Sequence, residues 1–201
     1  MNFTDLKVEV VGNKKSLEVF SQWIKNTVDL FDDTKCLKPT DVEKHISSSI
    51  LSIDSNEFII TECENGESLM HFSGENKGSA DAGLLADNKS QYDPSYISVK
   101  EACEILNLKC EIFCFDEGMC MVEHYIVDNN GQLVCEEEYE CEEFYLDDYD
   151  EYEDFIEENE DSQLDEEAFE EYKDSGYYRE CEVWDQEELD WLWKLNKKGG
   201  E

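Results

Sequence analysis

The fold is decided by residues 109–133, which read Lys-Cys-Glu-Ile-Phe-Cys-Phe-Asp-Glu-Gly-Met-Cys-Met-Val-Glu-His-Tyr-Ile-Val-Asp-Asn-Asn-Gly-Gln-Leu. Two runs rich in β-branched and aromatic residues, 109–116 and 119–128, flank the turn signal Glu117-Gly118. Asn129-Asn130-Gly131 provides a second turn before Leu133. Short apolar runs separated by Gly-containing turns are typical of antiparallel strands. The stretch therefore predicts a meander of three consecutive strands.

Two elements are predicted near the start of the chain. Residues 6–11 have the composition of a strand, and apolar residues at near-helical spacing then predict a helix from Asn13 to about Leu30. A second, shorter helix is predicted from Asp41 to Ile46, because Asp41 is suited to an N-terminal cap.

A hairpin and a helix are predicted between these elements and the meander. Asn65-Gly66 lies between two apolar runs, 57–64 and 67–73, and Asn-Gly in this position is a strong hairpin signal. Ser98 with Glu101 three residues later forms the capping-box pattern at the start of a helix.

The order of these elements predicts an α+β fold. Strand, helix, hairpin, helix and meander correspond to the ferredoxin-like β-α-β-β-α-β antiparallel sheet with an extra C-terminal strand. Both helices then lie on one face of the sheet and the other face is open. We expect this domain to occupy residues 1–135, and an acidic, aromatic-rich extension of one strand plus two or three helices to occupy residues 136–201.

Residues 106–133 resemble the second half of the YubB-like ferredoxin-like domain, a family carried on plasmids and phages. In that family a helix precedes a strand, a short acidic-Gly turn, a strand and an Asn/Asp-Gly turn. The first strand, Gly12-Asn13 and the following helix are similar to the family's opening, so the resemblance covers about residues 3–135. The resemblance implies a mobile-element setting and brings no catalytic residues with it.

Acidic residues dominate the C-terminal third of the chain. The net charge of the whole chain is −37, and 21 of the 37 residues from Glu136 to Tyr172 are Asp or Glu, with no Lys or Arg. Eight aromatic residues lie within this run. Disordered acidic tails have few aromatics, so the rings predict a folded surface that displays carboxylates at fixed positions. Such charge disfavours binding to nucleic acid and to anionic membranes, and it favours basic proteins or cations.

The spacing within the acidic run predicts one strand and two helices. Residues 135–141 alternate, which places Cys135, Tyr139 and Cys141 on one face together with Glu137, and Glu136, Glu138, Glu140 and Glu142 on the other. The first helical stripe consists of Tyr145, Tyr149, Tyr152 and Ile156. The second stripe consists of Leu164, Ala168, Phe169 and Tyr172, with Ser162 and Asp165 as its cap.

The helices need a surface on which their rings can be buried. Carboxylates four residues apart destabilise a helix by roughly 0.2–0.5 kcal/mol per pair. Burial of one aromatic side chain stabilises the folded chain by roughly 1.5–3 kcal/mol. The helices are therefore stable only if their aromatic side chains are buried against another surface. The open face of the sheet is the expected docking surface.

The acidic face is the predicted partner-binding site. Its predicted residues are Glu136, Glu138, Glu140, Glu142, Asp147, Asp148, Asp150, Glu151, Glu153, Asp154, Glu157 and Glu158. Trp191 falls off the apolar stripe of a final predicted helix, so it is a candidate interface anchor. The alternative interpretation is a solvated, partly disordered appendage that aids solubility.

These features predict an inhibitor that mimics nucleic acid. It would occupy the basic DNA- or RNA-binding groove of a host nuclease or effector complex, as an anti-CRISPR or anti-restriction protein in the host cytoplasm. Two alternatives remain open: an immunity protein that neutralises one basic nuclease toxin, and an acidic chaperone or scaffold for basic proteins.

Enzymatic and metal chemistry is not predicted. No Walker loop, Gly-x-Gly-x-x-Gly or His-Glu-x-x-His motif occurs, so we expect a non-enzyme without cofactor. The cysteines around His124 lack a Cys-x-x-Cys pair, and we interpret them as core thiols of a reducing compartment rather than zinc ligands. A calcium loop with the Asp-x-Asp-x-Asp-Gly pattern is also missing from the sequence.

Overall fold

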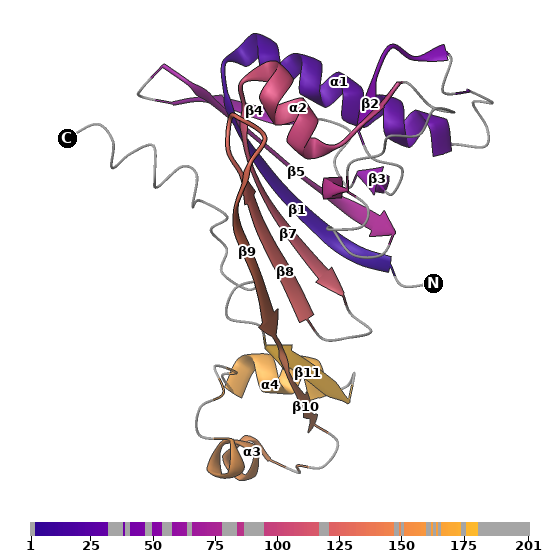
Figure 1. Ribbon diagram of the computed structural model, residues 1–201. Helices are drawn as coiled ribbons and strands as arrows, with labels where there is room; N and C mark the ends of the chain where they lie inside the picture. Colours follow the sequence, from indigo (N-terminus) through magenta and orange to yellow (C-terminus); the bar gives the residue numbers. More distant parts are fainter. Residues whose placement is uncertain are drawn as a thin grey trace.

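The computed structural model shows a large antiparallel sheet with two helices against it and a small acidic unit beyond the end of one strand (Figure 1). It describes residues 3–31, 38, 41–46, 50–53, 58–63, 66–77, 84–86, 95–116, 121–146, 149, 151–159, 162, 164, 166–173 and 176–180. Structural statements below refer to these residues.

The sheet has seven strands in the order β3-β5-β1-β7-β8-β9, and β4 also pairs with β5. All of these pairings are antiparallel. The strands are β1 Phe3–Gly12, β3 Ile50–Ile53, β4 Ile59–Glu62, β5 Ser68–Lys77, β7 Lys109–Asp116, β8 Met121–Val127 and β9 Leu133–Glu140. The predicted meander of three consecutive strands is therefore confirmed as β7, β8 and β9.

Two helices cover one face of the sheet (Figure 1). The first, α1 (Lys14–Phe31), begins where Asn13 Oδ1 accepts from the backbone N–H of Ser16 at 3.0 Å. The second, α2 (Val99–Leu106), has the predicted capping box of Ser98 and Glu101. The main core lies between the helices and the sheet and contains Leu17, Phe20, Ile24, Val8, Val10, Met70, Ile112 and Tyr125.

The hairpin at Asn65-Gly66 is confirmed by its backbone. The N–H of Cys63 donates to the carbonyl of Glu67 at 2.8 Å, and Gly66 has φ +83°. A positive φ is accessible to glycine without steric cost, so the turn forms where the sequence places it.

The predicted helix at residues 41–46 is wrong. His45–Ile46 forms a short strand, β2, that pairs in parallel with β6 (Tyr96–Ile97). Side chains of α1 hold this segment extended, because Asn26 Nδ2 donates to the carbonyl of Lys44 at 2.7 Å and Thr27 Oγ1 donates to that of Ile46. Long-range bonds to these carbonyls override the local capping signal.

The acidic unit is built from two strands and two helices. β10 (Glu142–Tyr145) pairs antiparallel with β11 (Tyr177–Glu180), and α3 (Tyr152–Glu158) and α4 (Glu166–Lys173) lie between them in the chain. Figure 1 places this unit beyond the end of β9, away from α1 and α2. Because β9 continues to Glu140, the predicted boundary after Cys135 falls within a strand of the sheet.

Candidate functional site

A row of carboxylates runs along β9. Glu136, Glu138 and Glu140 lie on one face of β9 and are all exposed, and they alternate with Cys135, Glu137 and Tyr139 on the other face. On one face of a strand, alternate side chains repeat every ~6.6–6.8 Å. The predicted alternation is therefore confirmed, and the row has a fixed spacing set by the backbone.

The partners of this row on β8 include another acid. Cross-strand pairing places Glu138 opposite Glu123, and Glu136 opposite Tyr125. Glu123 is buried, with 7% of its surface exposed, and Tyr125 Oη donates a hydrogen bond to its Oε1 at 3.4 Å. Like charges directly opposite each other destabilise a strand pair, so the row has an electrostatic cost in the free protein.

The acidic unit has its own aromatic core. Leu146, Phe155, Leu164 and Phe169 are buried together, and their neighbours are Phe144, Tyr149, Tyr152, Ile156 and Tyr178. Phe155 has its ring centroid 5.3–5.5 Å from those of Tyr149, Phe144 and Phe169. The rings thus pack on one another, and the expectation that they dock on the open face of the sheet is wrong for this cluster.

The carboxylates of this unit surround that core. Glu142, Glu151, Glu153, Asp154, Glu157 and Glu158 are all exposed. Tyr149 Oη donates to Glu158 Oε2 at 3.2 Å, and Tyr152 Oη donates to the carbonyl of Leu164 at 2.9 Å. The remaining predicted partner-binding residues, Asp147, Asp148, Asp150 and Trp191, lie outside the described residues.

The helical stripes were predicted only in part. Both acidic helices exist, but α3 begins at Tyr152, and Tyr145 belongs to β10 with 62% of its surface exposed. Phe144, the neighbour of Tyr145, points into the core instead. In the second stripe Phe169 is buried while Tyr172 is 42% exposed.

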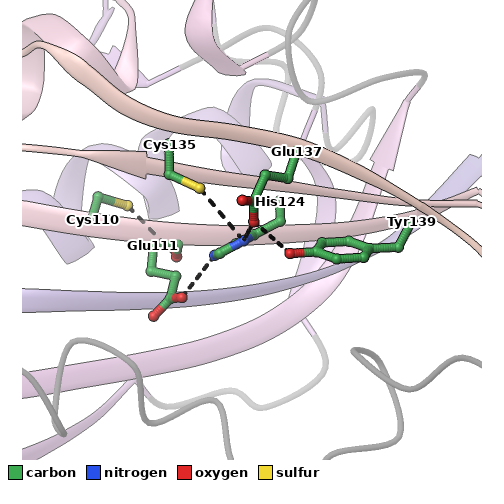
Figure 2. A network of polar contacts seen from close by, with 6 residues as sticks. All are labelled: Cys110, Glu111, His124, Cys135, Glu137 and Tyr139. Carbon is green, nitrogen blue, oxygen red and sulfur yellow. Dashed lines mark hydrogen bonds and ion pairs between the residues drawn. The ribbon is translucent and has the colours of Figure 1, made fainter.

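A second constellation lies on the sheet face opposite the helices (Figure 2). His124 of β8 is at its centre and is 1% exposed. Its Nε2 lies 2.8 Å from Oε1 of Glu111, which is fully buried. Its Nδ1 lies 3.3 Å from Oε2 of Glu137 and 3.8 Å from Sγ of Cys135. Tyr139 Oη donates to the same Glu137 oxygen.

The environment changes the acidity of three of these groups. Burial, and then the neighbouring Glu137, raise the pKa of the Cys135 thiol to about 11. Burial and the bond to Glu137 raise the pKa of Tyr139 to about 12. The hydrogen bonds from Tyr139 and His124 lower the pKa of Glu137 below its ordinary value. Without a bound cation the thiol and the phenol thus keep their protons at neutral pH.

This constellation was not predicted as a site, because it depends on the register between three strands. The register of the meander pairs His124 with Phe113 on β7 and with Glu137 on β9. Counting outward from Asn129-Asn130-Gly131 would have placed Glu136, not Glu137, opposite His124, because the sequence does not reveal the register shift between Ile126 and Val127. Glu111 reaches His124 diagonally, because its direct partner is Ile126.

Comparison of the chain with protein-family models, with curated proteins and with solved structures finds no significant match. The resemblance to the YubB-like ferredoxin-like domain therefore stays a prediction. In the described part of the chain, no helix has the length and apolar character needed to cross a bilayer.

Proposed function

We propose that this protein is a phage- or plasmid-encoded inhibitor that mimics nucleic acid. It occupies the basic DNA- or RNA-binding groove of a host defence nuclease complex, with anti-CRISPR or anti-restriction activity in the host cytoplasm. It performs no catalysis. The antiparallel order β4-β5-β1-β7 supports the ferredoxin-like assignment on which the mobile-element setting depends.

The observation that carries this proposal is the aromatic core inside the acidic unit. Four fully or almost fully buried side chains hold α3 and α4 together, and five further aromatic or aliphatic side chains pack around them. The exposed acids of α3 are therefore attached to a folded support rather than to a flexible tail. A support of this kind keeps the carboxylates close together before any partner is bound.

Preorganised charge has a direct energetic consequence for binding. A basic nucleic-acid groove is complementary to a dense array of negative charges, since phosphate contacts dominate nucleic-acid affinity. Because the backbone that carries these carboxylates is already folded, only their side chains have to be ordered on binding, at a cost of roughly 0.5–1.5 kcal/mol for each flexible side chain. The β9 row and the acids of α3 meet both conditions.

The test is displacement of nucleic acid from purified defence complexes. Guide-loaded CRISPR effectors and restriction endonucleases would each be bound to a fluorescent duplex, and release would be followed by anisotropy as the full chain is added. We expect release from at least one complex, with an inhibition constant that weakens steeply between about 50 and 200 mM salt. Inhibition without any displacement of the duplex would rule out mimicry.

Two variants with the same charge change separate the acidic face from net charge. The triple substitution Glu136→Gln, Glu138→Gln and Glu140→Gln alters the β9 row. The matched control is Glu18→Gln, Glu43→Gln and Glu104→Gln, three exposed acids elsewhere on the chain. We expect the first variant to weaken displacement at least tenfold more than the control. Equal effects would point to a general acidic chaperone, and activity against a single toxin nuclease would point to an immunity protein.

A further inference from the structure

Three side chains that bind metals converge on the sheet face opposite α1 and α2. His124 comes from β8, and Cys135 and Glu137 come from the neighbouring β9. One ligand atom from each of the three lies within 4.8 Å of the other two. Cys135 and Glu137 are two residues apart on one strand, so their side chains point to the same face as His124.

The distances between these atoms match those of a tetrahedral zinc site. Zn–N, Zn–O and Zn–S bonds of about 2.0–2.3 Å at tetrahedral angles place N and O about 3.4 Å apart, and N and S about 3.6 Å apart. The observed separations are 3.3 Å from Nδ1 of His124 to Oε2 of Glu137 and 3.8 Å to Sγ of Cys135. These two separations would change by only a few tenths of an ångström on binding an ion, and the third pair of ligand atoms, from Cys135 and Glu137, lies within 4.8 Å.

Glu111 orients the imidazole for this role. It lies against Nε2 of His124 at 2.8 Å and can accept the proton that Nε2 carries when Nδ1, which faces Cys135 and Glu137, binds a metal ion. The ring is further fixed by stacking on Phe113, with centroids 4.2 Å apart and planes inclined by 2°. A carboxylate behind a metal-bound histidine is the usual outer-shell arrangement, and it raises the basicity of the ligand.

Charge and access also favour a cation. Two carboxylates and a thiol surround one imidazole, and Tyr139 donates to Glu137 and thereby positions its carboxylate. The side chain of Glu137 is 51% exposed, which provides an entry path to the buried ring. We propose that His124, Cys135 and Glu137 bind one Zn²⁺ ion, or a divalent transition metal of similar preference, with Glu111 as the positioning carboxylate.

The ligand types define the class of metal. One nitrogen and one sulfur donor favour zinc and similar transition metals over Ca²⁺ and Mg²⁺, which take oxygen ligands. Coordination by sulfur replaces the thiol proton of Cys135, and that proton is released to solvent. The site is independent of the nucleic-acid-mimic function, because its ligands lie on the face of β9 opposite the Glu136, Glu138 and Glu140 row.

The probe for this site is Co²⁺, titrated into the reduced full-length chain. Excess Mg²⁺ is included to occupy the acidic surface. We expect a thiolate-to-cobalt charge-transfer band and tetrahedral visible bands that saturate at one Co²⁺ per chain, and loss of both bands when Zn²⁺ is added. Saturation without a charge-transfer band would overturn the proposal.

Single substitutions identify the ligands. Cys135→Ser is expected to abolish the charge-transfer band, whereas the matched control Cys141→Ser keeps it, because Cys141 lies just beyond the end of β9 and packs against the Phe113, Phe115 and Val122 cluster. Glu137→Gln is the second ligand variant, and its partial exposure makes it safer for folding than a change at His124. Glu111→Gln is expected to weaken Co²⁺ affinity roughly 10–100-fold while the band remains. Retention of the full band in Cys135→Ser, or unchanged affinity in Glu137→Gln, would refute the assigned ligands.

Discussion

Gly74 shows how a single residue constrains the sheet. It pairs with Leu6 of β1 on one side and with Ile53 of β3 on the other. A Cβ atom at position 74 would lie 2.2 Å from the carbonyl oxygen of Ser52 and 3.0 Å from Cα of Ile53. Both are backbone atoms, so a side-chain rotation cannot relieve the contact and β3 would have to move away.

Gly74→Ala is therefore expected to lower the free energy of unfolding by about 1–3 kcal/mol, the usual cost of overpacking. Urea denaturation measures the change. The control is Gly12→Ala, whose Cβ would meet Cδ2 of the buried Leu108 at 2.3 Å, a contact that repacking of one side-chain end can relieve without moving a strand. A smaller loss is expected for the control, and an equal or larger one would contradict the distinction between backbone and side-chain contacts.

For single residues, the sequence predicted the face of the strand on which a side chain lies better than it predicted the side chains that it contacts. Alternation along β9 was enough to separate the exposed Glu136, Glu138 and Glu140 from Cys135 and Tyr139. It could not reveal that Glu111 reaches His124, because that contact joins strands through their register and runs diagonally. The chain also contains 53 Asp and Glu residues, so the residue type alone does not indicate which acid is buried.

Elements were predictable where a local signal agreed with the tertiary structure. The capping box of α2, the Asn-Gly hairpin and the three strands of the meander each have their own turn or cap chemistry. Residues 41–46 also have a cap signal, but side chains of α1 donate hydrogen bonds to the carbonyls of this segment, and its backbone pairs with β6. The β10–β11 pair joins segments that are more than thirty residues apart in the chain, so it cannot be predicted from a local sequence pattern.

Phe155 is the central residue of the acidic unit, and its removal tests whether that unit folds on its own core. Phe155→Ala deletes a fully buried ring that packs against Phe144, Tyr149 and Phe169, with an expected cost of about 3–5 kcal/mol. Since the buried cluster consists only of residues of this unit, the loss is expected to stay local.

Hydrogen exchange provides the measurement for Phe155→Ala. Amides of α3 and α4 are expected to lose protection, while those of β1 and β7 keep it. Tyr145→Ala is the matched control, because Tyr145 is 62% exposed and its truncation leaves the cluster intact. Loss of protection in β1 as well would show that the acidic unit and the sheet unfold together.

At the scale of the whole molecule, charge balance sets the response to salt. With 53 acidic residues against 16 Lys and Arg, one-to-one pairing still leaves 37 negative charges without a basic residue. Folding brings these charges closer together than they are in an unfolded chain, and the repulsion opposes the compact state. A basic partner removes this repulsion, so the free protein and its complex respond to salt in opposite directions.

We expect NaCl to raise the thermal unfolding midpoint of the free chain between about 0.01 and 0.15 M, because the screening length falls from about 30 to about 8 Å. The Glu136→Gln, Glu138→Gln and Glu140→Gln variant is expected to be more stable than the parent at low salt by about 0.2–1 kcal/mol, since it removes the Glu138–Glu123 repulsion. The difference is expected to shrink at the higher salt concentration. A midpoint that stays constant or falls as NaCl is added would mean that the carboxylates are too far apart in the folded chain to repel one another, and it would remove the physical basis for a preorganised acidic surface.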